Sequence, residues 1–196
     1  MKNKTLWKSM KSGLRSGMGR KRWEIGKWYK QTGELSMCSN GYHASERIID
    51  SMQYVKLENL IKVEVKGEYL EQSDKQCWKE MRIIKAWKWE KKDSVALAIY
   101  AASLVLENFE KKHFEDKRPG EAIQAAKRWL KNPTKKNQSA AWSAESAASA
   151  AESAAWSAES AESAAWSAAY DITFNKIETW IRRRVNKLEE IKPSKG

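Results

Sequence analysis

The sequence predicts an α+β protein, in which a small strand-rich N-terminal domain is packed on an α-helical bundle with a long Ala/Ser/Trp-rich helix. Between residues 60 and 69, apolar and charged side chains alternate, which is typical of a strand with one buried face. After Lys92 the hydrophobic period changes from two to about 3.6, which indicates helices. The run from 139 to 170 is almost wholly Ala, Ser, Glu and Trp, and it lacks Gly and Pro, so it favours a helix. We therefore divide the chain into a basic N-terminal arm (1–22), a small α+β domain (23–91) and a helical bundle (92–196).

The predicted arm, residues 1–22, carries eight Lys or Arg residues and no acidic one. Its Gly residues make the backbone flexible. Such an arm can lie along phosphates through salt-sensitive contacts. The candidate anion or nucleic-acid ligands in it are Arg15, Arg20, Lys21 and Arg22. The alternative interpretation is a loosely ordered terminus that its charge keeps in solution.

Turn signals and local periodicity define the elements of the α+β domain. Short strands are expected over 23–30 and 35–38, on either side of a Gln-Thr-Gly-Glu turn. Ser45 can cap a short helix over 46–54. Two further strands are expected over 60–69 and 81–89.

The loop from Cys38 to Ser45 is the best candidate for chemistry. A His beside a Tyr at the start of a helix, here His43 and Tyr42, can bind a phosphate or act as an acid or base. In the alternative interpretation, these two side chains pack and form hydrogen bonds inside a small domain. No other nucleophile with an adjacent base, Gly-rich phosphate loop or carboxylate pair is evident.

The residues around this loop resemble a known pattern. Gly41-Tyr42-His43-Ala44 after a Cys, followed by a helix and Val63-Glu64-Val65 with Gly67-Glu68, is similar to an uncharacterised domain common in bacteriophage genomes. The resemblance covers about residues 20–90 and implies no particular function. The strand–loop–helix layout also resembles ADP-ribosyltransferase-like folds, which implies an enzyme of that type centred on His43.

Helical spacing continues through the second half of the chain. Asp93 or Ser94 can cap a helix that runs to about His113, and Pro119 suits the first turn of a helix that ends at Asn132-Pro133. A last helix is expected over 175–190, and it carries a second basic cluster, Arg182, Arg183 and Arg184. The residues expected in the core are Val63, Val65, Ile83, Ile99, Leu106 and Ile123.

The Ala-rich repeat, residues 139–170, presents a broad Ala face that another helix can approach closely, either within the chain or from a second copy. A three-residue insertion at Ser160–Glu162 rotates Trp166 away from Trp142 and Trp156. These Trp side chains either pack against neighbouring helices or form an exposed row that faces a partner.

The helical half also resembles a known family. The segment Asp116-Lys117-Arg118-Pro119, with Ala122-Ile123 and Ala125-Ala126 and the Ala-rich repeat that follows, is similar to helical proteins labelled as immunity proteins. This resemblance covers about residues 94–170, and it implies that the chain binds and blocks another protein.

Taken together, these features lead us to expect a non-catalytic accessory protein of a phage or mobile element, which binds and interferes with a host or toxin component. The formal charge of +12 keeps a second function open, namely binding of nucleic acid or a nucleotide. The third alternative is the ADP-ribosyltransferase-like enzyme. Self-association through the Ala face is also possible.

We expect no cofactor and no metal. Cys38, Cys77, His43 and His113 do not show the short spacing of metal ligands. The N-terminus does not resemble a signal peptide, and the longest apolar run, 95–106, is about half the length of a membrane span. These features favour the cytoplasm of a bacterial host and no membrane partner.

Overall fold

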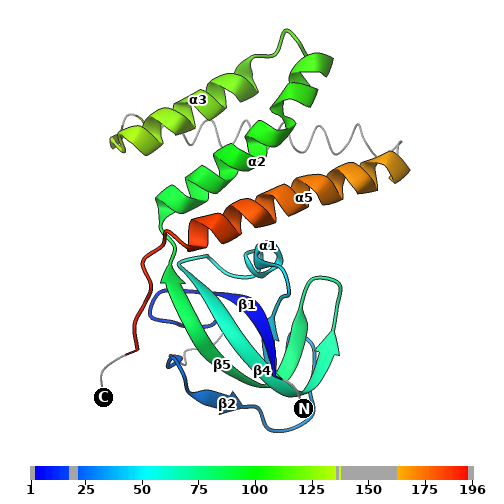
Figure 1. Ribbon diagram of the computed structural model, residues 1–196, viewed down its shortest axis with the longest axis vertical. Helices are drawn as coiled ribbons and strands as arrows, with labels where there is room; N and C mark the ends of the chain where they lie inside the picture. Colours follow the sequence, from blue (N-terminus) through cyan, green and yellow to red (C-terminus); the bar gives the residue numbers. More distant parts are fainter. Residues whose placement is uncertain (1–2, 18–21, 136, 138–162, 194–196) are drawn as a thin grey trace. The chain divides into compact units, whose positions relative to one another are not determined.

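The computed structural model describes residues 3–17, 22–135, 137 and 163–193 (Figure 1). An antiparallel sheet over residues 4–88 is followed by helices, which confirms the predicted α+β class. The chain forms two compact units. The first contains Met1–Glu90 together with Trp180–Gly196, and the second contains Lys91–Thr179.

The first unit is built on five strands and one short helix. The strands are β1 (Lys4–Met10), β2 (Trp28–Lys30), β3 (Tyr42–Ala44), β4 (Asn59–Glu71) and β5 (Gln76–Lys88), and the helix is α1 (Ile48–Ser51). In the second unit, α2 (Lys91–Lys112) and α3 (Arg118–Lys131) form a helical hairpin. A further helix, α5 (Ser163–Val185), begins in the second unit and ends in the first.

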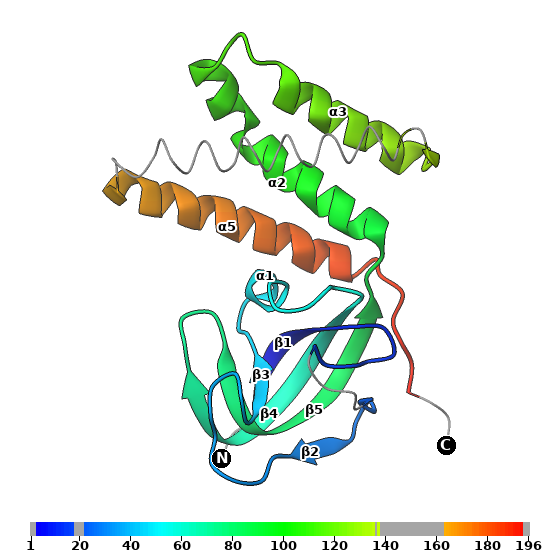
Figure 2. The ribbon, with the colours of Figure 1, turned by 180° about the vertical axis from the view of Figure 1, so that it is seen from behind.

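The sheet is strongly curved, with β4 and β5 along its full length (Figures 1 and 2). Its strand order is β1-β4-β5-β2, and β3 pairs with the first residues of β5. Trp7 and Ser45 then exchange two backbone hydrogen bonds of 2.8 Å, which connect β1 to the residue after β3. The sheet therefore closes on itself at this point, and its inner face encloses the core.

That inner face carries most of the apolar core of the first unit. The buried cluster comprises Leu6, Met10, Leu14, Trp23, Tyr29, Ala44, Ile61, Val63, Val65, Trp78, Met81, Ile83 and Ala86. The alternation of Ile61, Val63 and Val65 with charged residues thus confirms the predicted half-buried strand.

Of the six residues expected in the core, Val63, Val65, Ile83 and Ile123 are buried. Ile99 and Leu106, both on α2, are only partly buried. Apolar residues occur around most of the circumference of α2, so the face it packs on α3 cannot cover them all.

The expected basic arm differs most from the structure. Residues 4–10 form β1, which pairs with β4 along its whole length, from Lys4 opposite Val65 to Met10 opposite Asn59. Leu6, Trp7 and Met10 are buried there, and their burial stabilises the strand despite the surrounding positive charge.

The bounds of other predicted elements also differ from those in the structure. The segment 35–38 is not a strand: Ser36 and Asn40 exchange backbone hydrogen bonds of 2.9 and 2.8 Å that close a tight turn, and β3 follows it. The helix expected over 46–54 is the single turn α1. The strand expected over 23–30 is only the three-residue β2, whereas the one expected over 81–89 starts earlier, at Gln76.

The last predicted helix, 175–190, ends sooner, at Val185. Beyond it, the Ile191 amide donates to the Ala86 carbonyl (2.8 Å) and the Lys88 amide donates to the Glu189 carbonyl (2.9 Å). The segment 189–191 thus covers an edge of β5 that would otherwise leave backbone groups unpaired. These bonds compete with continuation of the helix.

Candidate functional site

The loop with Tyr42 and His43 is held against β5. In the register of β3 with β5, Tyr42 lies opposite Trp78 and His43 lies opposite Cys77. Gly41 precedes them at φ +138°, and a Cβ atom at this position would overlap the Cys77 sulfur and crowd Leu35. Only Gly fits this close approach, so the loop is tightly fixed in place.

His43 is engaged at two of its atoms. The backbone amide of Cys38 donates to His43 Nε2 (2.9 Å), and the Lys8 ammonium donates to the His43 carbonyl (2.7 Å). Burial, together with the positive charges of Lys8 and Lys75, lowers the pKa of His43 to about 4. The imidazole is therefore neutral at neutral pH and fixes the turn before β3.

The groups around His43 are not activated nucleophiles. Burial raises the pKa of the Cys77 thiol, to which the nearby Cys38 also contributes, so the thiol stays protonated at neutral pH. Burial lowers the pKa of Lys8 to about 8, but its ammonium is already bound to the His43 carbonyl. This arrangement favours a structural role for the cluster.

Tyr42 belongs to the core rather than to a site with His43. Its ring lies edge-on to that of Trp23, with centroids 5.1 Å apart, and burial raises the pKa of its hydroxyl. Tyr42 and His43 are also neighbours on a strand, and such side chains point to opposite faces. The structure thus favours the packing interpretation of this pair over a paired catalytic one.

Two of the predicted anion ligands are brought together. Arg15 pairs in an antiparallel bridge with Lys11 on one side and with Arg22 on the other. All three side chains are exposed. Arg20 and Lys21 lie outside the described residues. We call Lys11, Arg15 and Arg22 the basic row.

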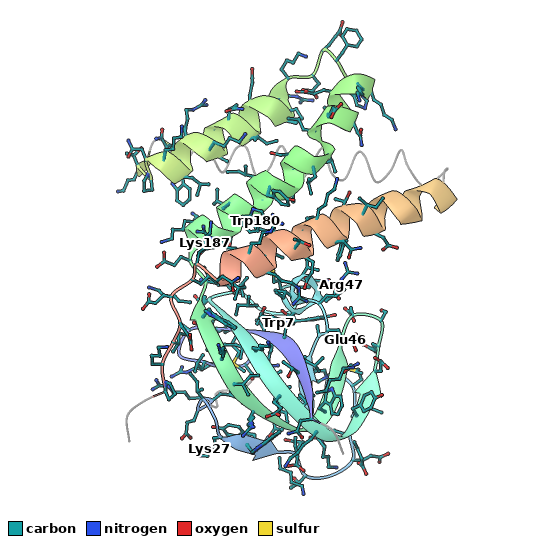
Figure 3. All side chains as sticks on the ribbon, in the orientation of Figure 1. Trp7, Lys27, Glu46, Arg47, Trp180 and Lys187 are labelled. Atoms are coloured by element: carbon teal, nitrogen blue, oxygen red, sulfur yellow. The ribbon has the colours of Figure 1, made fainter. Side chains whose placement is uncertain are left out.

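The second predicted basic cluster is divided. Arg182, Arg183 and Arg184 are consecutive in the last turn of α5, so their side chains diverge by about 100° each. The Arg182 guanidinium lies over the ring of Trp7 on β1, 5.7 Å from its centroid, and Arg183 is exposed. Figure 3 shows Trp7 on its strand and Trp180 on α5.

The partner-facing candidates are not placed. Trp142 and Trp156 lie outside the described residues, as does most of the Ala-rich repeat, and Trp166 falls on a part of α5 whose side chains are not described.

The turn end of the β4–β5 hairpin exposes apolar side chains that the sequence analysis did not single out. Tyr69 is 49% exposed and Leu70 is 39% exposed, and because they are adjacent in β4, their side chains point to opposite faces of the hairpin. Tyr54 is 47% exposed, and Lys75 of the hairpin turn lies over its ring at 4.4 Å. We call Tyr54, Tyr69 and Leu70 the hairpin surface.

One residue of the hairpin surface, Tyr69, packs on a buried aromatic ring. Tyr69 stacks on the buried Trp78, with ring centroids 4.4 Å apart and planes inclined by 13°. The pairing of β1 ends opposite Val65, so the part of β4 that follows has no β1 neighbour. Tyr69 and Leu70 therefore lie on a part of the β4–β5 hairpin that β1 does not cover.

A second cluster missed from the sequence surrounds Trp28 on β2. Lys66 and Arg82 lie over its ring, at 4.4 and 4.9 Å from the centroid. Glu64 pairs with Arg82 (2.5 Å), and Glu80 pairs with Lys66 (3.4 Å). Because the acidic groups balance the cations, this cluster stabilises the outer face of the sheet rather than offering a net charge to a ligand.

The second unit contains a shallow depression of about 660 Å³ between α2 and α3. Its lining combines both signs of charge: Leu106, Glu110, Lys117, Gly120, Glu121, Gln124 and Arg128. It therefore shows no preference for an anion or a cation. Within the described ranges, no three His, Cys, Asp or Glu side chains gather as metal ligands, and no helix combines the length and apolarity of a membrane span.

The described residues define an α+β fold, with exposed apolar side chains near the turn of the β4–β5 hairpin and a basic row after β1. Residues 4–93 match the family model of DUF7666, a domain of unknown function. No curated protein and no solved structure matches the chain. The family description names no activity or partner, so the resemblances to phage-associated and immunity proteins remain predictions.

Proposed function

We propose that the chain is a non-catalytic accessory protein of a phage or mobile element, which acts in the cytoplasm of a bacterial host. In this proposal it binds a host or toxin component and interferes with it. The hairpin surface is the observation that carries the proposal, and the two sequence resemblances supply the class of partner.

The hairpin surface has the composition of a protein-binding site. Tyr is enriched among the residues that dominate binding energy, because its ring buries a large area at a small entropic cost. Tyr69 and Leu70 lie on opposite faces of the hairpin end, and Tyr54 lies beside Lys75 of its turn; each is more than a third exposed. The stack of Tyr69 on Trp78 holds one ring in place before a partner arrives, and such preorganisation lowers the entropic cost of binding.

The bonding around His43 supports binding over catalysis. A base must be free to take a proton from the substrate, whereas His43 Nε2 accepts the Cys38 amide. The neutral imidazole and the protonated Cys77 thiol leave the loop with structural contacts. This weakens the ADP-ribosyltransferase alternative that the strand–loop–helix layout suggested.

Site-specific photocrosslinking tests the proposal. A benzophenone amino acid replaces Leu70 in one protein and Val105, which is 50% exposed on α2, in a control. Each is irradiated in lysate of a bacterial host, and adducts are identified by mass spectrometry. We expect a discrete adduct from position 70 that is absent from position 105.

A second variant separates a specific adduct from adventitious labelling. Adding Tyr54→Ser and Tyr69→Ser to the position-70 protein should remove the adduct while its circular dichroism spectrum is retained. The purified partner should then lose activity when it is mixed with the unmodified chain. Equal labelling at both positions, or a partner whose activity does not change, would overturn the proposal.

A further inference from the structure

The basic row is a feature of the described backbone and not only of composition. The Lys11 amide donates to the Arg15 carbonyl (2.9 Å), which closes a turn that contains Gly13 and Leu14 at positive φ. Arg15 then bridges to Arg22 on its other side. Residues directly opposite each other in antiparallel pairs have side chains on the same face, about 5 Å apart.

Three cations in such a row repel one another. Like charges placed directly opposite on paired strands are destabilising. None of the three side chains forms an ion pair with a carboxylate among the described residues. In the part of the chain that the structure describes, the Lys11 ammonium donates to the Gly17 carbonyl alone (2.9 Å). An anion that bridges the row would therefore relieve repulsion that the free protein retains.

The acidic groups of this region are already engaged. Glu58 accepts the Ser12 amide (2.7 Å) and pairs with Lys56 (3.2 Å). Glu24 pairs with Lys27 (2.7 Å), and the pKa of Glu24 is lowered mainly by that lysine, with a smaller contribution from Arg22. These carboxylates lower the positive potential near the basic row, but they do not form ion pairs with Lys11, Arg15 or Arg22.

We propose that the basic row of Lys11, Arg15 and Arg22 binds the sugar–phosphate backbone of a nucleic acid. The row extends about 10 Å, the length over which one strand presents about three phosphates. Arg supplies two of the three positions, and its planar guanidinium donates two parallel hydrogen bonds to a phosphate.

The same geometry disfavours an anionic membrane. Loops that bind membranes insert exposed apolar side chains into the lipid boundary. Here the apolar residues next to the row are turned inward: Leu14 and Trp23 are buried, and the Trp23 indole donates to Ser16 (3.0 Å). The site shares no residue with the hairpin surface, so it stands independently of the proposed protein-binding function.

The test is fluorescence anisotropy with a labelled single-stranded oligonucleotide and its duplex, using the full chain. The triple variant Lys11→Gln, Arg15→Gln, Arg22→Gln is compared with the control Lys85→Gln, Lys127→Gln, Lys135→Gln, which removes the same charge at exposed positions elsewhere. We expect the row variant to weaken binding at least about tenfold and to reduce the salt slope for the single strand by about 2. The control variant should bind the oligonucleotides with nearly the affinity and salt slope of the unmodified protein.

Two further arms keep the result interpretable. Arg15→Lys with Arg22→Lys retains the charge and should retain most of the salt slope, and thermal unfolding confirms that each variant is folded. Phosphatidylserine/phosphatidylcholine vesicles replace the oligonucleotide in the second arm. An equal loss of oligonucleotide affinity in the row and control variants would overturn the proposal. Binding of the chain to vesicles but not to oligonucleotides would also overturn it.

Discussion

Trp7 and Ser45 exchange two backbone hydrogen bonds of 2.8 Å, and this pair joins the first strand of the sheet to the end of β3. The pair turns an open, curved sheet into one that closes around its core. Both residues are buried, so neither backbone group can turn to water if the pair is broken.

Replacing Ser45 with Pro should therefore destabilise the protein. Pro removes the amide that donates to Trp7 and leaves that carbonyl buried without its bond, at a cost of about 2–4 kcal/mol. Ser45→Ala keeps the amide and should cost about 1 kcal/mol or less. Urea unfolding followed by Trp fluorescence measures both, and similar midpoints for the two variants would count against closure by this pair.

Gly41→Ala should be more harmful than the same change at Gly26. Both have positive φ, but a Cβ at Gly41 meets the Cys77 sulfur and Leu35, whereas a Cβ at Gly26 meets nothing within 4 Å. We expect a loss of about 2–4 kcal/mol at Gly41, and about 1 kcal/mol at Gly26 from backbone strain alone. Chemical denaturation checks the difference, which should shrink when Cys77→Ala is added to Gly41→Ala.

His43 should make the protein sensitive to mild acid. Its folded-state pKa is about 4, below the ordinary value of 6.5, so the unfolded chain takes up a proton first as pH falls. The contribution to stability is complete above pH about 6.5 and is lost progressively towards pH about 4, by about 2–3 kcal/mol.

Urea unfolding at pH 7 and at lower pH, for the unmodified chain and for His43→Gln, measures this dependence. Gln retains a hydrogen-bond acceptor for the Cys38 amide but does not titrate, so the variant should lose less stability in acid. His113→Gln, at an exposed position, serves as the matched control. If the free energy of unfolding fell equally with pH in His43→Gln and in the unmodified protein, His43 would not be the group responsible for the acid sensitivity.

The stack of Tyr69 on Trp78 should contribute to stability as well as to the hairpin surface. Tyr69→Ala removes a ring whose centroid lies 4.4 Å from that of Trp78, and we expect a loss of about 1 kcal/mol. Tyr69→Phe preserves the stack and should leave stability almost unchanged. Thermal unfolding of both variants tests this, and an equal loss in both would assign the effect to the hydroxyl instead.

Periodicity predicted the central part of the fold well. The alternation around Ile61, Val63 and Val65 marks β4, because one face of that strand is buried and the other is wet. The same method missed β1. Its inner face reads Lys4, Leu6, Lys8 and Met10, so Lys residues interrupt the apolar alternation. Lys4 pairs with Glu46 and Lys8 with the His43 carbonyl, partners that are distant in sequence.

The turn before β3 was equally hard to predict. The Asn40 side chain donates to the carbonyls of Thr32 (3.0 Å) and Glu34 (2.6 Å), and Cys38 adopts a φ of +64°. Non-Gly residues seldom adopt that conformation, so local propensity favoured a strand instead. The turn is fixed by side-chain contacts that no local pattern reveals.

Composition selected Arg15 and Arg22 as candidate anion ligands, but it did not predict their pairing. That pairing depends on Leu14 at φ +56°, another conformation that sequence alone does not indicate. Tyr69 and Leu70 of the hairpin surface were missed because they follow a register shift between Lys66 and Tyr69, and a shift of register changes which side chains face the solvent. Backbone geometry that depends on the folded chain therefore determines which side chains form the basic row and the hairpin surface.

The most direct test of the proposed binding function is an interference assay with the purified partner and two variants. The first, His43→Gln, changes the loop that resembles a catalytic site. The second, Tyr54→Ser with Tyr69→Ser and Leu70→Ser, changes the hairpin surface. We predict that His43→Gln still inhibits the partner and that the hairpin variant does not, with both folded at the assay temperature. Loss of inhibition in His43→Gln and its retention in the hairpin variant would contradict the account.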